Sequence, residues 1–171
     1  RYRSLKLINS RSFEIIISID YKKGDEGILV AHGDQGGGYS IYIEDGELNH
    51  VHNGYGDMTE VSCGELSEGV SEIKLTVEAA GDLIWNTKVF VDGSVVAETN
   101  NLPVLTAMAP FEGIDVGIDR RSPVSWSLYE RHGTFPYTGS LNSVTYVPGE
   151  LAPDAGTRWI DFLRDSGVKY E

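Results

Sequence analysis

The stretch that decides the fold is a hairpin, Gly38-Tyr-Ser-Ile-Tyr-Ile-Glu-Asp-Gly-Glu-Leu-Asn-His-Val-His-Asn53. Apolar and polar residues alternate on both sides of Asp45-Gly46. The Asp-Gly pair favours a type I′ turn, because both central residues of that turn need a positive φ. The same pair recurs at Asp92-Gly93, between two further alternating runs. The sequence therefore predicts antiparallel strands joined by tight turns.

The period of two continues outward from this hairpin over most of the chain. Phe13–Asp20 is rich in Ile, which predicts a strand buried on both faces or nearly so. Further strand candidates cover residues 27–33, 71–78, 114–119 and 139–147, which makes nine or ten strands in all. No helix-period segment interrupts them, which argues against a parallel α/β sheet. We expect an all-β fold, an antiparallel β-sandwich over residues 12–148.

The two ends of the chain follow different patterns. Residues 1–11 are basic, and we interpret them as a linker or an entering strand. In residues 149–171, an acidic cap and a terminal Gly167 predict a short C-terminal helix. This helix would pack on its own sandwich or on another protomer, as a homo-oligomer contact, through the apolar residues Trp159, Ile160, Phe162 and Leu163. The sequence begins at Arg1 without a methionine or a signal peptide, from which we expect a fragment of a longer protein.

Composition excludes several classes of protein. The chain has 171 residues, with 14 basic and 26 acidic side chains and a net charge of −12. Because a chain with this much negative charge repels phosphate backbones, we expect no nucleic-acid partner. No apolar run reaches the length of a membrane span. A single cysteine, Cys63, cannot form an internal disulfide.

The order of motifs resembles that of the concanavalin A and laminin-G-like jelly rolls. The pattern consists of Gly27-Ile-Leu-Val-Ala-His-Gly33, the hairpin, Val89-Phe-Val-Asp-Gly93 and Tyr137-Thr-Gly-Ser-Leu-Asn-Ser-Val144. A closer similarity is to the C-terminal β-sandwich of bacterial arylsulfatases. The motifs shared with that domain are Ala31-His-Gly-Asp-Gln-Gly-Gly-Gly38, Tyr42 to Asn53, Val116-Gly-Ile-Asp-Arg-Arg-Ser-Pro-Val124 and Phe135-Pro-Tyr-Thr-Gly139.

This resemblance implies a non-catalytic accessory domain of a sulfatase, which would shape the substrate cleft, pack against an upstream catalytic domain or mediate assembly. The parent enzyme would need a divalent cation and a formylglycine made from a C/S-x-P-x-R motif, whereas this segment would need no cofactor. Cys63 lies in Ser62-Cys-Gly-Glu-Leu-Ser67, without the proline and arginine of that motif. We therefore expect Cys63 to be a small buried hydrophobic residue and the segment itself to lack sulfatase chemistry.

Two sets of residues are metal candidates. His50 and His52 share one strand face, and His32 lies on a neighbouring strand, so three converging imidazoles would suit zinc. Calcium at a loop edge would need convergent oxygen ligands, for which the candidates are Asp34, Asp57 and Asp119. The competing interpretation of both sets is side chains that face solvent or hydrogen-bond to loops.

Aromatic residues in or beside predicted loops and hairpins suggest a different function. Flat side chains of this kind stack on sugars in carbohydrate-binding modules, and the alternative is that they pack in the core. Trp126 and Tyr129 stand out because they fall in a long irregular stretch, residues 122–134. The alternative function is therefore a carbohydrate-binding module of laminin-G-like type, with a glycan as partner. Its candidate contacts are Tyr39, Tyr42, Tyr55, Trp126 and Tyr129.

Overall fold

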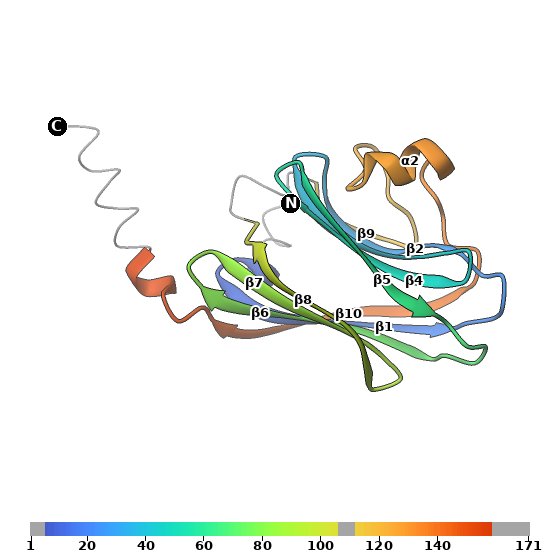
Figure 1. Ribbon diagram of the computed structural model, residues 1–171, viewed down its shortest axis with the longest axis horizontal. Coiled ribbons are helices and arrows are strands. Elements are labelled where there is room, and N and C mark those ends of the chain that lie inside the picture. The colour runs from blue at the N-terminus through green and yellow to red at the C-terminus, as the bar shows by residue number, and fades with distance from the viewer. Residues whose placement is uncertain (1–5, 106–111, 159–171) are drawn as a thin grey trace.

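The computed structural model describes residues 6–105 and 112–158, which form a sandwich of two five-stranded antiparallel sheets (Figure 1). In spatial order, the first sheet contains β10 (Ser140–Leu151), β1 (Arg11–Asp20), β6 (Glu72–Gly81), β7 (Ile84–Val91) and β8 (Ser94–Pro103). The second sheet contains β5 (Asp57–Glu65), β4 (Glu47–Gly54), β3 (Gly37–Glu44), β2 (Gly27–Asp34) and β9 (Ile114–Val116). The predicted all-β antiparallel sandwich is confirmed.

The two Asp-Gly turns have the geometry that the sequence predicts. Asp45 and Gly46 have φ values of 52° and 83°, and the turn pairs Glu44 with Glu47. Asp92 and Gly93 have φ values of 44° and 82° and join β7 to β8. Both turns need backbone conformations that Asp tolerates and Gly adopts freely, so these residues fix the register of the two hairpins.

The main core lies between the sheets and follows the alternation of the strands. In β1, every second residue from Phe13 to Ile19 is buried and the residues between them are half-buried. The prediction that Phe13–Asp20 is buried on both faces or nearly so therefore holds for the inner face, while the outer face of β1 is only half-buried. Trp85 packs edge-on against Phe13, with ring centroids 5.4 Å apart. Cys63 is buried at the margin of this core, as expected, and burial raises the pKa of its thiol to about 11.

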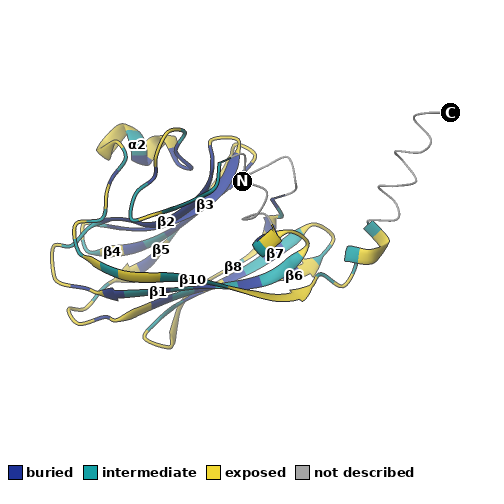
Figure 2. Cartoon of the chain, turned by 180° about the vertical axis from the view of Figure 1, so that it is seen from behind, coloured by how far each residue is buried: buried dark blue, intermediate teal, exposed yellow. Residues whose placement is uncertain are grey.

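The inner strands of the second sheet, in contrast, are buried on both faces, whereas its edge strands β5 and β9 are not. All eight residues of β2 are buried, as are all those of β3 except Glu44. The loops around helix α2 (Trp126–His132) cover the outer face of this sheet, and Figure 2 shows the helix lying over strands coloured as buried. The contact forms a second, smaller core from Ile28, Ala31, Tyr42, Val51, Val124, Leu128 and Phe135. The sequence predicts an irregular stretch over residues 122–134, and helix α2 within it corrects that prediction.

The ends of the described chain pack onto the sandwich. Residues 6–8 are helical, and Ile8 is fully buried in the main core. Strand β10 continues to Leu151, three residues beyond the predicted boundary at 148. Residues 155–158 form a helical turn in which the Arg158 amide donates to the Asp154 carbonyl at 3.0 Å. The four apolar residues of the predicted C-terminal helix, from Trp159 to Leu163, lie outside the described residues. No helix of the described ranges has the length and apolar character needed to cross a membrane.

Candidate functional site

A surface groove lies between the start of α2 and the edge strand β5. It has a volume of about 570 Å³, within the range of small-ligand sites. Three chain segments distant in sequence build it: the β2–β3 turn, the β4–β5 hairpin and the segment that begins α2. The lining residues are Gln35, Asn53, Gly56, Met58, Val124, Ser125, Trp126 and Ser127.

Helix α2 begins at the groove because of a local capping signal. Ser125 has extended backbone angles and its hydroxyl accepts from the Leu128 amide at 3.4 Å, so it is the N-cap. Gly133, with a φ of 68°, ends the helix, and its amide donates to the Tyr129 carbonyl at 2.7 Å. Leu128 faces the second sheet and is buried. The helix is therefore short, anchored at both ends, and fixed with Trp126 as its first residue.

Buried hydrogen bonds hold the approach to α2 against the sheet. The side-chain amide of Asn53 donates to the carbonyls of Gln35 and Val124, each at 3.0 Å. The Asp119 carboxylate accepts from the Val124 amide at 2.9 Å. Burial raises the pKa of Asp119 to about 6, and nearby acidic groups act in the same direction. The hydrogen bond from the Val124 amide lowers the pKa but does not outweigh burial. Gly38 allows the close approach, since a Cβ there would lie 2.9 Å from a Val124 methyl.

Two aromatic rings form an exposed platform on α2. Trp126 is 51% exposed, the largest exposed aromatic side chain in the described ranges. Tyr129 lies one turn later, and the two rings stack with centroids 5.4 Å apart and planes inclined by 26°. Tyr129 packs against one side of the Trp126 indole and holds it in a fixed orientation. The indole therefore offers a broad apolar surface at the groove.

Hydrogen-bonding groups flank this platform. The hydroxyls of Ser125 and Ser127, on either side of Trp126, donate to Glu60 Oε1 at 3.3 and 3.5 Å. The same two hydroxyls lie 3.2 Å apart. Glu60 is an exposed residue of β5, so these bonds join the start of the helix to the edge of the second sheet. The site combines an aromatic surface with a carboxylate, two hydroxyls and the exposed amide side chain of Gln35.

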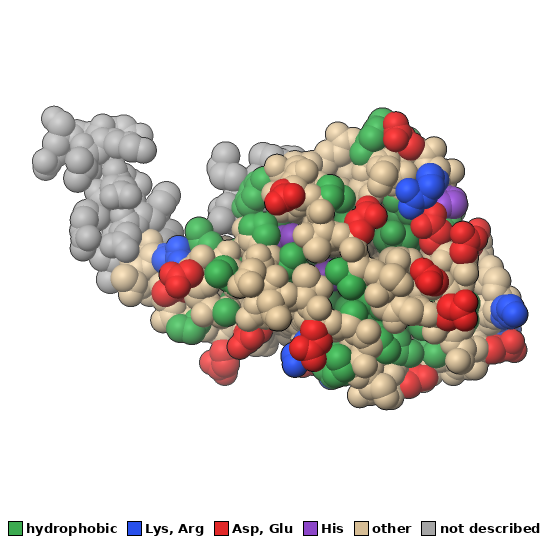
Figure 3. All heavy atoms as spheres, viewed as in Figure 1, with side chains coloured by type: hydrophobic (Ala, Val, Ile, Leu, Met, Phe, Trp, Pro, Cys, Tyr) green, Lys and Arg blue, Asp and Glu red, His purple; other side chains and the backbone are tan. Residues whose placement is uncertain are grey.

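The groove carries no positive charge of its own. None of the described residues that line it is Lys or Arg. Arg131, on the following turn of α2, forms a bidentate pair with Glu44 at 3.0 Å for both bonds, and these hydrogen bonds are the largest cause of a lowered pKa at Glu44. Figure 3 shows acidic side chains scattered over this face, with few basic ones among them.

The structure separates the five aromatic candidates. Trp126 lines the groove and Tyr129 stacks on its ring. Tyr55 is also exposed, on the β4–β5 turn, but its hydroxyl donates to the Val104 carbonyl at 3.2 Å. Tyr39 and Tyr42 belong to β3 and are buried, so the expectation that they are exposed to a ligand is wrong. Their hairpin is covered on both faces, which the alternating pattern does not reveal.

The metal candidates do not converge. Within residues 6–105 and 112–158, no group of three His, Cys, Asp or Glu side chains is placed to hold a metal ion. The hypothesis of three converging imidazoles is therefore wrong. His52 lies 2.9 Å from the Pro103 carbonyl, and His32 lies 2.9 Å from the Tyr39 hydroxyl. Burial lowers the pKa values of His32 and His52 to about 4 and that of His50 to about 3, so all three are neutral core residues at pH 7.

The aspartate candidates serve the loops instead. Asp34 accepts from the amides of Gly36 and Glu112 at 2.7 and 3.1 Å, and Asp119 accepts from Val124. Asp57 is exposed at the start of β5. Asp34 lies near enough to Asp119 to contribute to its raised pKa, but the three carboxylates do not form a group of three that could hold a metal ion. Asp34 and Asp119 instead fix the loop backbone.

Sequence reasoning missed most of the polar half of the groove. Ser125 could have been found, because a serine immediately before Trp-Ser-Leu-Tyr is a helix N-cap signal. Asn53 ends the hairpin motif, although its partner, the Val124 carbonyl, lies 71 residues later. Glu60 and Met58 have no such signal, since only the packing of α2 on β5 brings them to the site.

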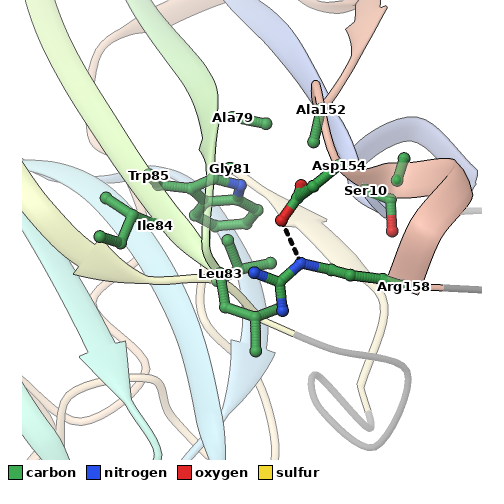
Figure 4. Close-up of a pocket in the computed structure, with 11 residues that line it drawn as sticks. Ser10, Ala79, Gly81, Leu83, Ile84, Trp85, Ala152, Asp154 and Arg158 are labelled. Atoms are coloured by element: carbon green, nitrogen blue, oxygen red, sulfur yellow. Dashed lines mark hydrogen bonds and ion pairs between the residues drawn. The ribbon is translucent and has the colours of Figure 1, made fainter. Parts of the chain in front are cut away.

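A second pocket lies at one end of the sandwich and is lined mainly by apolar groups, with the Trp85 ring at its base (Figure 4). Its volume is only about 20 Å³. Asp154 accepts from the Asp82 amide at 2.9 Å and pairs with Arg158, so the chain after β10 is tied across the pocket. This arrangement closes the end of the main core rather than offering a ligand site.

The fold is a jelly-roll β-sandwich of laminin-G type, as its similarity to solved structures indicates. No family model matches the sequence, and no curated protein matches it either. The similar solved structures include a CBM40 from the IT-sialidase of Ruminococcus gnavus, at a TM-score of 0.57 and 14% identity, over 89% of this chain and 83% of that one.

Two further structures are similar to this chain. Mouse laminin α1 domains LG4-5 have a TM-score of 0.56 and 13% identity, over 84% of this chain and 40% of that one. The leech intramolecular trans-sialidase has a TM-score of 0.54 and 10% identity, over 87% of this chain and 23% of that one. At these identities the likeness establishes the fold alone. It agrees with the predicted concanavalin A and laminin-G-like class and gives no support to a sulfatase parent.

Proposed function

We propose that this chain is a carbohydrate-binding module whose groove holds a sugar against Trp126. The observation that carries the proposal is the half-exposed indole, stacked on Tyr129 and flanked by two serines that bond to Glu60. The similar R. gnavus module has also been solved with α2,3-sialyllactose, and that structure is 13% identical to this chain with a TM-score of 0.57.

The chemistry of the groove suits a pyranose ring. One face of such a ring presents C–H groups, which pack on a flat aromatic surface, whereas its edge presents hydroxyls. In this groove the indole would take the C–H face, and Glu60, Ser127 and Gln35 would meet the hydroxyls. The contacts are few and the groove is open, so we expect weak binding that depends on preorganisation of the stacked rings.

The experiment is calorimetric titration of the whole chain with oligosaccharides chosen from a glycan array. The variant Trp126→Ala removes the platform from an exposed helix position without opening the core, and we expect affinity to fall at least tenfold, equivalent to about 1.4 kcal/mol. The control is Phe90→Ala, which removes an aromatic ring from the outer face of the first sheet. A chain that binds no glycan, or binds equally well without Trp126, would overturn the proposal.

The second candidate function is the accessory domain of a sulfatase, supported by the order of motifs alone. Several residues of those motifs hold in place the covering segment, by which we mean the chain from Asp119 through α2 that lies over the second sheet. Gly38 lies beside Val124, Asn53 donates to the Val124 carbonyl, and Asp119 accepts from the Val124 amide. Any domain that carries α2 in this position needs these contacts, whatever its neighbour in the chain. The shared motifs are therefore explained by the packing of α2 and do not by themselves favour a sulfatase. For this reason we place glycan binding first. The test is the gene itself, because a sulfatase parent requires a C/S-x-P-x-R motif in the same reading frame.

A further inference from the structure

The charge of the groove points to a narrower class of ligand. Resting on the proposed function, we propose that the groove selects neutral glycans and rejects those that carry a carboxylate or a sulfate at the bound sugar. The selecting residue is Glu60, with Trp126 as the platform on which the sugar lies.

Glu60 is held in a position where its carboxylate can accept hydrogen bonds from sugar hydroxyls. Both serines that flank Trp126 donate to its Oε1 atom, which fixes the carboxylate beside the aromatic platform. Among the described residues, no hydrogen-bond donor reaches its Oε2 atom within bonding distance. An ionised carboxylate only accepts hydrogen bonds, so a sugar hydroxyl can donate to Oε2 whereas an acidic group cannot. Glu60 therefore favours ligands that bring hydroxyls to this edge of the groove.

Among the described residues, the arginines of α2 and of the segment before it are each paired with a carboxylate, so none is left as an unpaired cation for an acidic sugar. In the segment before α2, Arg120 pairs with Asp115 at 2.8 Å and Arg121 with Glu112 at 3.8 Å. On the last turn of α2, Arg131 donates to both oxygens of Glu44 and to the Ser127 carbonyl at 3.2 Å. Glu44 neutralises this guanidinium, and the exposed Glu130 adds a further negative charge on the same helix. The whole chain carries a net charge of −12, which repels anions at longer range. Local and global charge thus act in the same direction.

This inference separates the chain from the R. gnavus module that it resembles in fold, whose solved complexes contain sialyllactose. The fold supplies a scaffold for the loops, and the charge of the groove is set by residues from β5 and α2. A shared jelly roll therefore does not imply a shared ligand.

The test uses pairs of glycans with the same core, one neutral and one capped by sialic acid or sulfate, titrated against the whole chain. Lactose and 3′-sialyllactose are one such pair, and glycan-array hits supply others. We expect the neutral member to bind at least tenfold more tightly and with little dependence on salt concentration. We expect Glu60→Gln, which keeps the shape of the side chain, to reduce this preference, and Glu60→Lys to reverse it.

The outcomes distinguish this inference from the proposed function. Binding that depends on Trp126 but favours the acidic member would overturn the selectivity and leave glycan binding intact. A preference for neutral glycans that is unchanged in Glu60→Gln and Glu60→Lys would overturn the role of Glu60. Absence of binding to every glycan would overturn the proposed function and the inference together. Thermal unfolding of each variant verifies that the chain remains folded.

Discussion

The outer faces of the two sheets differ in what they meet. On the first sheet, Lys88 forms an ion pair with Glu98 at 3.2 Å, both about half exposed, and the Lys74 ammonium lies 4.7 Å from the centre of the Phe90 ring. On the second sheet, Tyr42 and Val51 are buried beneath Leu128 of α2. One face is therefore solvated and the other is a second core.

This difference explains where the groove lies. A bare sheet face offers side chains at regular spacing but little concavity, whereas a helix that covers only part of a sheet leaves a step at its margin. Trp126 lies at that step, and Glu60 lies on the strand exposed beside it. The covering segment thus creates the site as well as burying the sheet.

The largest expected effect is a loss of stability in acid, because all three buried histidines belong to the second sheet. Below pH 6.5 the unfolded chain protonates His32, His50 and His52, while the folded chain keeps them neutral until about pH 4 or lower. The free energy of unfolding therefore decreases as the pH falls through this window, by on the order of 3 kcal/mol for each histidine. Urea unfolding followed by tryptophan fluorescence at successive pH values measures the loss.

Asp119 works in the opposite direction and supplies a control. Its folded pKa of about 6 lies above its ordinary value of 3.8, so the folded chain takes up a proton first and gains stability as the pH falls between these values. This gain in the free energy of unfolding is about as large as the loss expected from one histidine. In Asp119→Asn the free energy of unfolding should therefore fall more steeply below pH 6. A free energy of unfolding that stays level from pH 6.5 to 4.5 in the unaltered chain would contradict the assignment of neutral core histidines.

The next effect compares apolar residues on the two outer faces. Leu128→Ala removes a buried side chain from the second core, and we expect a loss of about 3 kcal/mol from transfer and cavity formation. Val95→Ala, at a residue 48% exposed on the first sheet, should cost less than about 0.5 kcal/mol. Urea unfolding measures both variants. Equal losses would mean that α2 does not stabilise the second sheet.

Sequence reasoning reached the strands and hairpins of both sheets more easily than the covering of the second sheet. Alternation and the Asp-Gly turns were enough to predict strands, hairpins and the main core, since these depend on residues close in sequence. The covering of β2 and β3 depends on a segment about 90 residues later, as the bond from Asn53 to Val124 illustrates at a separation of 71. Trp126 and Tyr129 were found as candidates because a long, irregular stretch with aromatic residues usually contacts a ligand or a partner. Glu60 was not found, because its role exists only once β5 and α2 are packed together.

A third, intermediate effect tests how closely the covering segment approaches the sheet. A Cβ at Gly38 would lie 2.6 Å from the His32 carbonyl oxygen and 2.9 Å from a Val124 methyl. We expect Gly38→Ala to cost about 1–3 kcal/mol and to weaken glycan binding through displacement of the segment that leads to Trp126. Gly113→Ala is the matched control, since a Cβ there meets no atom within 4 Å. Similar denaturation midpoints for the two variants would show that the segment tolerates a shift.

The smallest effect concerns one ion pair from each outer face, compared by double-mutant cycles in urea. Lys88 and Glu98 are about half exposed, so solvent screens them and we expect a coupling energy of about 0.2–0.5 kcal/mol. Glu44 is only 20% exposed and binds Arg131 through two hydrogen bonds, so its coupling should be larger, about 1 kcal/mol. Because the second pair ties the last turn of α2 to β3, its loss should also loosen the platform and weaken glycan binding, whereas loss of the first pair should not. Equal coupling in both cycles would mean that the covered face gives its ion pair no protection from solvent.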